Sequence, residues 1–481
     1  MDEVRKCLSK DPLSELTKKE KEYILYSRDY ICTIPSTLEI FLRCINWLNP
    51  LHVNMARIYI KKWAKITPED AVGLLDARFP DTFVREYAIS ILRECPDDII
   101  DLYMLQLCQC LIYETNLVSP LSDFLLEKSI TNPKLIGNSF VWNSIVNIKN
   151  RLFQEKLSVY LTQLFMICGN NFFDSVMSSY EKTKMMRELS LKLKDANKRA
   201  VEKDTAKKEY LKKFLKERMK EYESKGFQNF TFPIHQSYKC TVCVPEKFII
   251  FSSKMVPYKL HCKSSDGTEF GIIFKFGDDL RQDVLTLQML KIMDKLWLDN
   301  DLDLKITAYK VQPTGLKEGL IEFCRAHSVS ALQQKEGVGG ALDRELILKF
   351  LRQTSSNTKN NYNSEHQHEN FVRSLAGFCV ATCVLGIGDR HPDNVMVKDN
   401  GIFFHIDYGH ILGNFKYKFG IKRERAPFLL THEFVHVYTK TGREEHFKMY
   451  CVQALNILRK NANRLINLFI IMSSAGMLKN N

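Results

Sequence analysis

The spacing of apolar residues separates a helical part of the chain from a part that begins with strands. Up to about residue 175, apolar residues recur every three or four positions, most clearly over 74–92, and this spacing predicts helices. The Thr-Pro-Glu-Asp segment at 67–70 has the cap, the proline and the acidic first turn of a helix start, and Asp81 begins the next helix in the same way. Successive helix pairs of this kind favour an α-solenoid, and an irregular helical domain is the alternative.

After the helical part, short apolar runs bounded by turn residues indicate strands, and longer periodic segments indicate helices. A helix is expected over 281–298, and helices return in the C-terminal third. A stretch rich in Ser, Asn and His at 355–370 is predicted to be a polar surface loop, in which His366 and His368 are more often solvated than metal-bound. The predicted strands are 240–245, 247–251, 270–276, 304–313 and 319–324.

The charge of the chain is positive and unevenly distributed. Its net charge is +13, and residues 182–220 carry 15 Lys and Arg against 6 Asp and Glu. A basic run of this kind is usually a solvated helix face, although it would also be attracted to an anionic membrane surface. No aromatic stacking platform or recognition motif accompanies it, so nucleic acid is not an expected partner.

The fourteen cysteines have no regular spacing, which indicates reduced thiols inside a cell. The charged start gives no sign of a signal peptide, and the apolar run 465–478 is interrupted and too short to span a bilayer. Cys240 and Cys243 form a CxxC within an alternating run, and no second pair follows at zinc spacing. A strand is therefore the favoured interpretation of this segment, and a metal site is the alternative.

Asp389, Asn394 and Asp407 form the most informative polar pattern of the chain. Asn394 and Asp407 flank two apolar runs, 395–398 and 402–406, which are joined by an Asp-Asn-Gly turn. An Asn-Gly turn between apolar runs predicts a β-hairpin, and such a hairpin would bring Asn394 and Asp407 together at its open end. An amide oxygen and a carboxylate there could hold Mg²⁺ against nucleotide phosphates. A chance hairpin with solvated polar ends is the alternative interpretation.

The residues around this hairpin match the components of a kinase signature. Protein kinases carry His-Arg-Asp, an Asn five residues after that Asp, and Asp-Phe-Gly. Here the first tripeptide is reversed, Asp-Arg-His at 389–391, and the last is Asp-Tyr-Gly at 407–409. The reversed tripeptide resembles the phosphoinositide 3- and 4-kinase superfamily, which includes the large kinases that phosphorylate proteins.

From about residue 12 to its end, the chain resembles the helical and catalytic domains of phosphoinositide 3-kinases, and the class I catalytic subunits most closely. The motifs of the catalytic part are highly specific, and those of the helical part are moderately so. The resemblance rests on the segments 11–17, 71–76 and 84–89 of the helical part, and on 271–275, 277–283, 319–324 and the two hairpin blocks of the catalytic part.

The resemblance implies an α+β fold class, with an α-solenoid helical domain followed by a bilobal protein-kinase-like domain. The helical accessory domain is expected at 1–175 and the catalytic domain at 176–481, with the basic lead-in and N-lobe at 176–324 and the C-lobe at 325–481. Class I kinases carry adaptor-binding, Ras-binding and lipid-binding modules before the helical domain, and this chain is expected to lack them. They also continue with further helices, so the C-lobe is expected to be truncated and to expose apolar surface around 465–472.

The resemblance also implies roles for individual residues. Asn394 and Asp407 are the expected Mg²⁺ ligands, and ATP is the expected co-substrate. Asp389 and His391 would lie where the attacking hydroxyl must lie, and either could accept its proton or orient it. His410 could contact the γ-phosphate or share the role of base. The expected ATP-binding residues are Ser253, Lys254, Ile273, Lys275, Asp283, Tyr309, Ile321, Glu322, Cys324, Met396 and Ile406. The expected lipid head-group residues are Lys416, Lys418, Lys422, Arg423 and Arg425.

These roles follow the family's chemistry. Lys275 ends an apolar strand, where a buried ammonium would meet an α-phosphate, and Asp283 in the next helix could orient it. The segment 322–324 resembles the hinge whose backbone reads adenine. A head group with several phosphates needs several cations near the transferred phosphate, and two basic boxes after Asp407 resemble the class I pattern.

The implied function is a lipid kinase that transfers the ATP γ-phosphate to the 3-hydroxyl of phosphoinositides, with phosphatidylinositol 4,5-bisphosphate as the expected substrate. The chain would then be cytoplasmic and peripheral at the cytosolic face of membranes, with an anionic phosphoinositide surface as its partner. A serine/threonine protein kinase of the related branch is an alternative, because Pro392 resembles that branch. A second alternative is a weakened kinase that acts as a membrane-associated scaffold.

Two departures from the family pattern concern the phosphate-binding loop. Met255 stands where the family usually has a lysine two residues before the proline, and Lys259 stands where it has the tryptophan over the nucleotide. Lys254 precedes the methionine, but neighbouring residues of an extended segment face opposite ways. We therefore expect a weaker affinity for ATP than in typical members.

Overall fold

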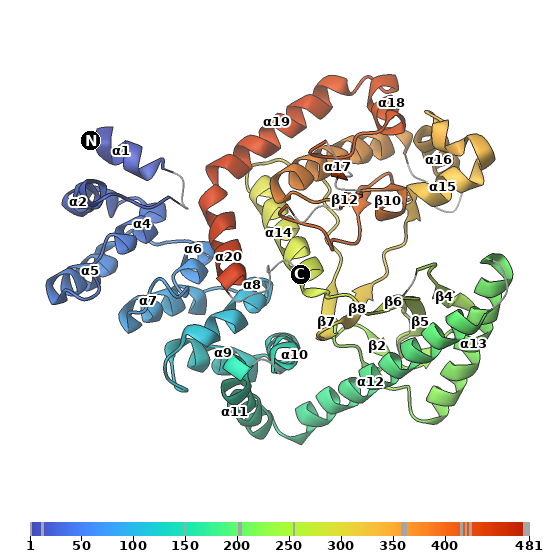
Figure 1. Cartoon of the computed structure of the whole chain (residues 1–481), viewed down its shortest axis with the longest axis horizontal. Coiled ribbons are helices and arrows are strands. Elements are labelled where there is room, and N and C mark those ends of the chain that lie inside the picture. Colours follow the sequence, from blue (N-terminus) through green and yellow to red (C-terminus); the bar gives the residue numbers. More distant parts are fainter. Residues whose placement is uncertain are drawn as a thin grey trace.

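The computed structural model describes residues 2–10, 14–148, 151–200, 204–253, 255–356, 363–413, 417–418, 421–422 and 426–474. A helical domain lies beside a kinase-like domain, and the last helix of the described chain returns to the boundary between them (Figure 1). The fold class expected from the sequence is confirmed: an α-solenoid precedes a bilobal, sheet-containing catalytic domain.

The helical domain consists of stacked helix pairs. One layer contains α7, α9 and α11, and a second contains α6, α8 and α10, with each helix packed against the next of its own layer. The predicted helix starts are present, because Thr67 forms a capping box with Asp70, and the Asp81 side chain accepts hydrogen bonds from the first turn of α7. The helices are α1 Asp2–Leu8, α2 Lys18–Tyr26, α3 Arg28–Ile31, α4 Leu38–Arg43, α5 Pro50–Lys62, α6 Pro68–Gly73, α7 Thr82–Arg93, α8 Asp97–Cys110, α9 Pro120–Thr131, α10 Asn138–Asn147 and α11 Arg151–Cys168.

The basic stretch forms two long helices, α12 (Asn170–Arg199) and α13 (Asp204–Ser224), which pack against each other and against the N-lobe sheet (Figure 1). They are more than solvated faces, because their apolar residues enter the N-lobe core. Helix α12 also runs without interruption across residue 175, where the domain boundary was expected. The buried residues are Met186, Leu189 and Leu193 of α12 and Leu211, Leu215 and Met219 of α13.

The N-lobe is an antiparallel sheet with the order β3-β5-β6-β8-β7, in which β4 also pairs with β5. Side chains alternate between two faces, as they must in a strand. Ile272, Phe274 and Leu320 are buried beneath α12 and α13, whereas Ile273 and Ile321 are only partly buried on the opposite face. The strands are β1 Phe230–Thr231, β2 Lys239–Cys240, β3 Val242–Cys243, β4 Ile249–Ile250, β5 Tyr258–Lys263, β6 Glu269–Phe276, β7 Val311–Gly315 and β8 Glu318–Glu322.

The strand expected at 304–313 is wrong over most of its length, since only β7 from Val311 onward is a strand. Lys305 has a left-handed backbone with a φ of 51°, which no strand residue can adopt. The chain here packs against α17 instead, and Leu304 and Ile306 lie directly against Gly377. The helix expected at 281–298 is confirmed as α14 (Arg281–Leu298).

The C-lobe is built around the predicted hairpin and helix α17, which pack together. The polar loop expected at 355–370 is wrong from Ser364 onward, because Asn363 caps α17 and its side chain accepts a hydrogen bond from Glu365 N. His366 and His368 therefore lie on a helix. The elements are β9 His327–Ser328, α15 Val329–Lys335, α16 Leu346–Ser355, α17 Ser364–Leu385, β10 Val395–Val397, β11 Phe403–His405, β12 Tyr417–Lys418, β13 Ile421–Lys422, α18 His432–Lys440, α19 Glu444–Lys460 and α20 Ala462–Ser474.

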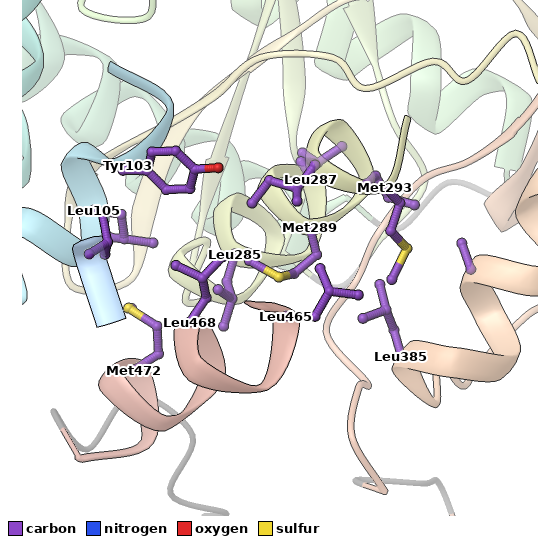
Figure 2. Packing of buried hydrophobic residues seen from close by; sticks show 14 of the residues in the cluster. Tyr103, Leu105, Leu285, Leu287, Met289, Met293, Leu385, Leu465, Leu468 and Met472 are labelled. Carbon is purple, nitrogen blue, oxygen red and sulfur yellow. The ribbon is translucent and has the colours of Figure 1, made fainter. Parts of the chain in front are cut away.

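The apolar surface expected around 465–472 is not exposed. Figure 2 shows Leu465, Leu468 and Met472 of α20 beside Leu285 and Met289 of α14, and all five side chains are buried. The other side of α20 packs against α6 and α8 of the helical domain. The expectation failed because the helical domain covers this face. Among the helices of the described ranges, none combines the length and the apolar character that a membrane span requires.

Asp294 of α14 predicts how the stability of the folded chain depends on pH. Its Oδ1 atom is buried without a hydrogen-bond partner among the described residues. Burial, aided by the charge of Asp303 and opposed by Lys305, raises the pKa of Asp294 from 3.8 to about 6. Between these values the folded chain holds a proton that the unfolded chain has lost, so the free energy of unfolding falls as pH rises. Asp294→Asn should therefore stabilise the chain by about 1–2 kcal/mol at about pH 7.5, and by about half of this at about pH 5.

The melting temperatures of the wild type and Asp294→Asn at the two pH values measure this effect. An Asp195→Asn variant is the control, because the Asp195 carboxylate is 62% exposed and lies 4.0 Å from the Lys198 ammonium. An equal rise in melting temperature at both pH values would contradict the assignment.

Candidate active site

The hairpin β10–β11 brings Asn394 and Asp407 to the same end of two paired strands. Val395 lies opposite His405, and Ile406 N–H donates to the Asn394 carbonyl over 3.0 Å, so the pairing continues to the residues just before Asp407. The Asp-Asn-Gly turn is at the other end. The hairpin predicted from the sequence is confirmed, and it aligns the two residues as the sequence analysis expected.

The Asn394 side chain is held in a defined orientation. Its amide nitrogen donates to the Asp389 carbonyl over 2.9 Å, which leaves the amide oxygen as the group that can accept. Asp389 and Asp407 both adopt left-handed backbones, with φ values of 58° and 60°. Such strain is concentrated at functional sites. An amide oxygen and a half-exposed carboxylate are hard oxygen donors, and this pair fits a divalent cation that takes its remaining ligands from phosphate and water.

Arg390 joins the loop before the hairpin to the loop after it. Its buried guanidinium donates to the Gly388 carbonyl over 2.8 Å, to the Ile406 carbonyl over 2.7 Å and to the Asp407 carbonyl. The rigid fork of an arginine suits three acceptors in fixed positions. Sequence analysis assigned no role to Arg390, although its place between Asp389 and His391 was the available signal.

Asp389, His391 and His410 meet where these two loops run side by side. His391 Nε2 lies 3.9 Å from Asp389 Oδ2, and its Nδ1 lies 3.5 Å from the exposed Asp393. Gly388 N–H donates to the His410 carbonyl over 2.8 Å, which ties the His410 backbone to the loop that carries Asp389. The three predicted catalytic residues are thus on adjacent loops, and which of them is the base stays a prediction.

Lys275 reaches from the N-lobe toward three carboxylates. Its Nζ lies 2.9 Å from Asp278 Oδ2 and 3.4 Å from Asp407 Oδ1. Burial lowers the pKa of Lys275, but Asp407, Asp283 and Asp278 outweigh burial and raise it, so the ammonium stays charged. Burial raises the pKa of Asp283 to about 6 against the opposing effect of Lys275. Asp283 Oδ1 also accepts from Tyr408 N–H over 3.0 Å, which positions the loop of Asp407.

The predicted adenine slot combines residues from both lobes. Ile273 and Ile321 are direct cross-strand partners on the partly buried face of the sheet. Tyr309, Ile321, Met396 and Ile406 all belong to or pack against one apolar cluster, and the Tyr309 ring stacks on Tyr408 at 6.5 Å. The structure therefore pairs Ile273 with Ile321, and it packs Tyr309, Met396 and Ile406 into or against the same cluster as Ile321.

The predicted hinge residue Glu322 has both its side chain and its backbone N–H engaged, since the N–H donates to the Lys310 carbonyl over 2.9 Å. Both of its carboxylate oxygens are engaged, Oε1 by the Tyr238 hydroxyl at 2.7 Å and Oε2 by Lys310 N–H at 2.8 Å. Phe323 N–H donates to the Gly271 carbonyl over 3.1 Å, and Cys324 follows as a partly buried residue. That the hinge reads adenine through its backbone stays a prediction.

The phosphate-binding loop lies at the edge of the same face. Ser253 Oγ accepts from Met255 N–H over 3.4 Å, and Lys254 lies outside the described residues. The Met255 side chain packs against Gly277, where a Cβ atom would lie 1.7 Å from the methionine Cε. Glycine is required there for this contact, and its φ is +112°. Met255 thus turns toward the loop that carries Asp278.

Lys259 occupies the face of the predicted nucleotide slot. It lies directly opposite Ile273, it is buried, and its Nζ lies 4.2 Å from the centre of the Phe323 ring. A lysine at this position cannot stack on a base as an aromatic ring does, and such stacking contributes about 1–3 kcal/mol. Lys259→Trp should therefore lower the Michaelis constant for ATP by about five-fold or more.

Initial rates at varied ATP concentration measure this change, and Lys317→Trp in the exposed turn between β7 and β8 is the matched control. An unchanged or higher Michaelis constant in Lys259→Trp would refute the role given to this position.

Few of the predicted head-group residues lie in the described ranges. Lys418 and Lys422 are on β12 and β13, which pair in antiparallel fashion with Tyr417 opposite Lys422. Lys416, Arg423 and Arg425 lie outside the described residues. Their roles stay predictions.

Comparisons with known proteins agree with this geometry. Residues 269–481 match the family model described as phosphatidylinositol 3- and 4-kinase, and residues 1–176 match that of the phosphoinositide 3-kinase accessory domain, or PIK domain. The chain is 35% identical over 97% of its length to phosphatidylinositol 3-kinase 1 of Dictyostelium discoideum, and 35% identical over 99% to phosphatidylinositol 3-kinase 3 of the same organism. Phosphatidylinositol 3-kinase 2 is 34% identical over 99% of the chain.

The chain spans between 25% and 29% of the length of these three relatives. The aligned part contains the helical domain, both lobes and the hairpin with its two flanking loops. On the combined evidence of both family matches, the relatives and the site, the chain belongs to the phosphatidylinositol 3- and 4-kinase family, with its catalytic domain and the PIK accessory domain.

Proposed function

We propose that the chain is a lipid kinase that transfers the γ-phosphate of ATP to the 3-hydroxyl of an inositol lipid. The observation that supports this most is the hairpin, which presents Asn394 and Asp407 at one end, tied through Asn394 Nδ2 to the loop of Asp389 and facing Lys275. Three relatives that carry the name phosphatidylinositol 3-kinase support the reaction class.

The residues of the site have separate roles in phosphoryl transfer. Asn394 and Asp407 would hold Mg²⁺, which neutralises charge on the phosphates when bound. Lys275 supplies a fixed positive charge at the N-lobe side, and its ion pairs with Asp278 and Asp407 hold it there before nucleotide binds. Asp389, His391 or His410 accepts the proton of the 3-hydroxyl as its oxygen forms the bond to phosphorus and ADP leaves.

We further propose phosphatidylinositol 4,5-bisphosphate as the substrate, at the cytosolic face of a membrane. The two basic boxes after Asp407 support this, because several cations near the transferred phosphate favour a head group with several phosphates. The protein-kinase alternative depends on Pro392 alone, and the names of the relatives do not favour it.

The direct test is a kinase assay with the purified chain, ATP and Mg²⁺. Vesicles contain phosphatidylinositol, its 4-phosphate or its 4,5-bisphosphate, and a peptide pool is assayed beside them. Lipid phosphorylated at the 3-position is the expected product. Phosphate only on peptides would overturn the proposal in favour of a protein kinase, and no product with any substrate would favour a scaffold.

The basic boxes make a separate prediction about substrate preference. Replacing Lys416 and Lys418 with alanine should reduce the use of the 4,5-bisphosphate about ten-fold or more relative to phosphatidylinositol, because two charge-assisted contacts are lost. The ratio of initial rates on the two lipids measures the effect. A Lys440→Ala/Lys460→Ala variant removes two exposed lysines of the same lobe as a control. An unchanged ratio would rule out the assignment of the box.

A further inference from the structure

Three buried cysteines of the N-lobe, on β2, β3 and β5, lie close together. The sulfur atoms of Cys240, Cys243 and Cys262 lie within 4.8 Å of one another, and all three residues are buried. Cys243 Sγ and Cys262 Sγ are 4.0 Å apart, and both thiols are free. Within the ranges that the structure describes, no other three His, Cys, Asp or Glu side chains come this close together.

The geometry of the strands explains why a CxxC can face one side. Residues three apart on a regular strand point to opposite faces. Here Val242 lies opposite Lys263, and Thr241 N–H also donates to the Lys263 carbonyl over 2.9 Å. Two residues opposite one form a β-bulge, which shifts the alternation by one residue. Cys240 and Cys243 therefore point to the same buried face.

Cys262 comes from the neighbouring strand. It is the direct cross-strand partner of Cys243 on β5, and directly opposed residues share a face of the sheet. This third cysteine is 19 residues after Cys243 in the sequence and belongs to no second CxxC. That is why a search for paired motifs favoured a simple strand.

A carboxylate from another element lies beside Cys243, outside the group of three sulfur atoms. Glu223 lies near the C-terminal end of α13, beside Cys243. Its Oε1 atom is buried and accepts no hydrogen bond from the part of the chain that the structure describes. A buried carboxylate oxygen without a donor is costly, so it points to a missing partner.

We propose that Cys240, Cys243, Cys262 and Glu223 form a structural Zn²⁺ site. Zinc is bound by thiolates at about 2.3 Å in a tetrahedron, which separates the sulfur atoms by about 3.8 Å. The 4.0 Å between Cys243 and Cys262 fits this value and is about twice the length of a disulfide bond. Three soft sulfurs and one oxygen select Zn²⁺ over Mg²⁺ or Ca²⁺. Four protein ligands leave no open position for catalysis.

The site would join helix α13 to two strands that are already hydrogen-bonded to each other. It connects α13 to β3 and to β5, the strand that starts directly after the phosphate-binding loop. Binding of the ion stabilises the folded N-lobe, because the unfolded chain does not hold the ligands together. The proposal does not depend on the kinase activity of the chain.

Metal content of the purified chain is the first measurement. Expressed with zinc and freed of loosely bound ions by gel filtration, the wild type should contain about one zinc ion per chain. Cys243→Ser and Cys262→Ser should contain less than about a tenth of this, while Cys108→Ser, which changes a buried thiol of α8 in the helical domain, should retain it. A wild type that is folded and contains no zinc would overturn the proposal.

Cobalt substitution and the milder variant Glu223→Gln test the site even if the cysteine variants do not fold. Replacing zinc with Co²⁺ should give the strong visible absorption of a tetrahedral site and a thiolate charge-transfer band. Glu223→Gln leaves the three thiols in place and should weaken zinc binding about ten-fold or more in a chelator competition. Octahedral cobalt spectra, unchanged affinity in Glu223→Gln, or a Cys243–Cys262 disulfide found by mass spectrometry would each refute the site.

Discussion

Asp407→Ala should abolish phosphate transfer while the chain remains folded. The variant removes one of the two oxygen donors at the open end of the hairpin and one of the carboxylates around Lys275. Loss of the bound cation removes several kcal/mol of charge stabilisation from the transition state, which corresponds to a decrease in rate of about 1,000-fold or more. The Asp407 side chain is half exposed, so its removal leaves no cavity in the core.

A second variant, Asp407→Asn, separates the effect of the lost charge from the effect of the left-handed backbone. Asp407 has a φ of 60°, which asparagine tolerates better than alanine does. Asp407→Asn should therefore melt close to the wild type and still lose at least about 100-fold of its activity, because a neutral amide binds a divalent cation weakly. Asp195→Asn is again the exposed-carboxylate control. Activity of Asp407→Ala within about ten-fold of the wild type would contradict the proposed metal ligand.

Arg390→Ala should lower both stability and activity. The substitution leaves three carbonyls without this donor, that of Gly388 in a buried position and those of Ile406 and Asp407 in partly buried ones. Unpaired buried groups of this kind destabilise a fold by about 2–4 kcal/mol. Because Arg390 holds the loop of Asp389 against the loop of Asp407, we also expect a loss of at least about 100-fold in rate at saturating ATP.

The mechanism of this loss can be checked with two further variants. Arg390→Lys keeps the charge but cannot donate to three carbonyls in fixed positions, so it should lie between the wild type and Arg390→Ala in both melting temperature and rate. Arg352→Ala removes an arginine whose side chain is 62% exposed and should change neither. An Arg390→Lys variant with full activity would show that charge, and not the three hydrogen bonds, is what the site needs.

Local patterns predicted the local features of the fold well. The caps of α6 and α7, helix α14 and the hairpin were all predictable, because each depends on residues close together in the sequence. The kinase motifs predicted which residues the hairpin and its loops would bring together. Strand β5 was missed although Tyr258 to Lys263 alternates, since its lysines and histidine mask the apolar positions.

Features that depend on distant contacts were not predictable. The burial of α20 requires α6 and α8 of the helical domain, which are more than 300 residues away along the chain. The hydrogen bond from Asn467 to Glu39 spans 428 residues. The cysteine cluster requires a bulge and a neighbouring strand. Arg390 acts by donating hydrogen bonds to three backbone carbonyls. The pattern of side chains in the sequence does not indicate which backbone carbonyls accept such bonds.

The two apolar clusters have a mechanical consequence for the cleft. One cluster lies in the N-lobe beneath α12 and α13, and the other runs from the helical domain through α14 into the C-lobe. Lys275 belongs to a strand of the first, whereas Asp283 and Asp407 are held by the second. The ion pair between Lys275 and Asp407 therefore links one apolar cluster to the other. Because it is partly exposed, high salt should weaken this link.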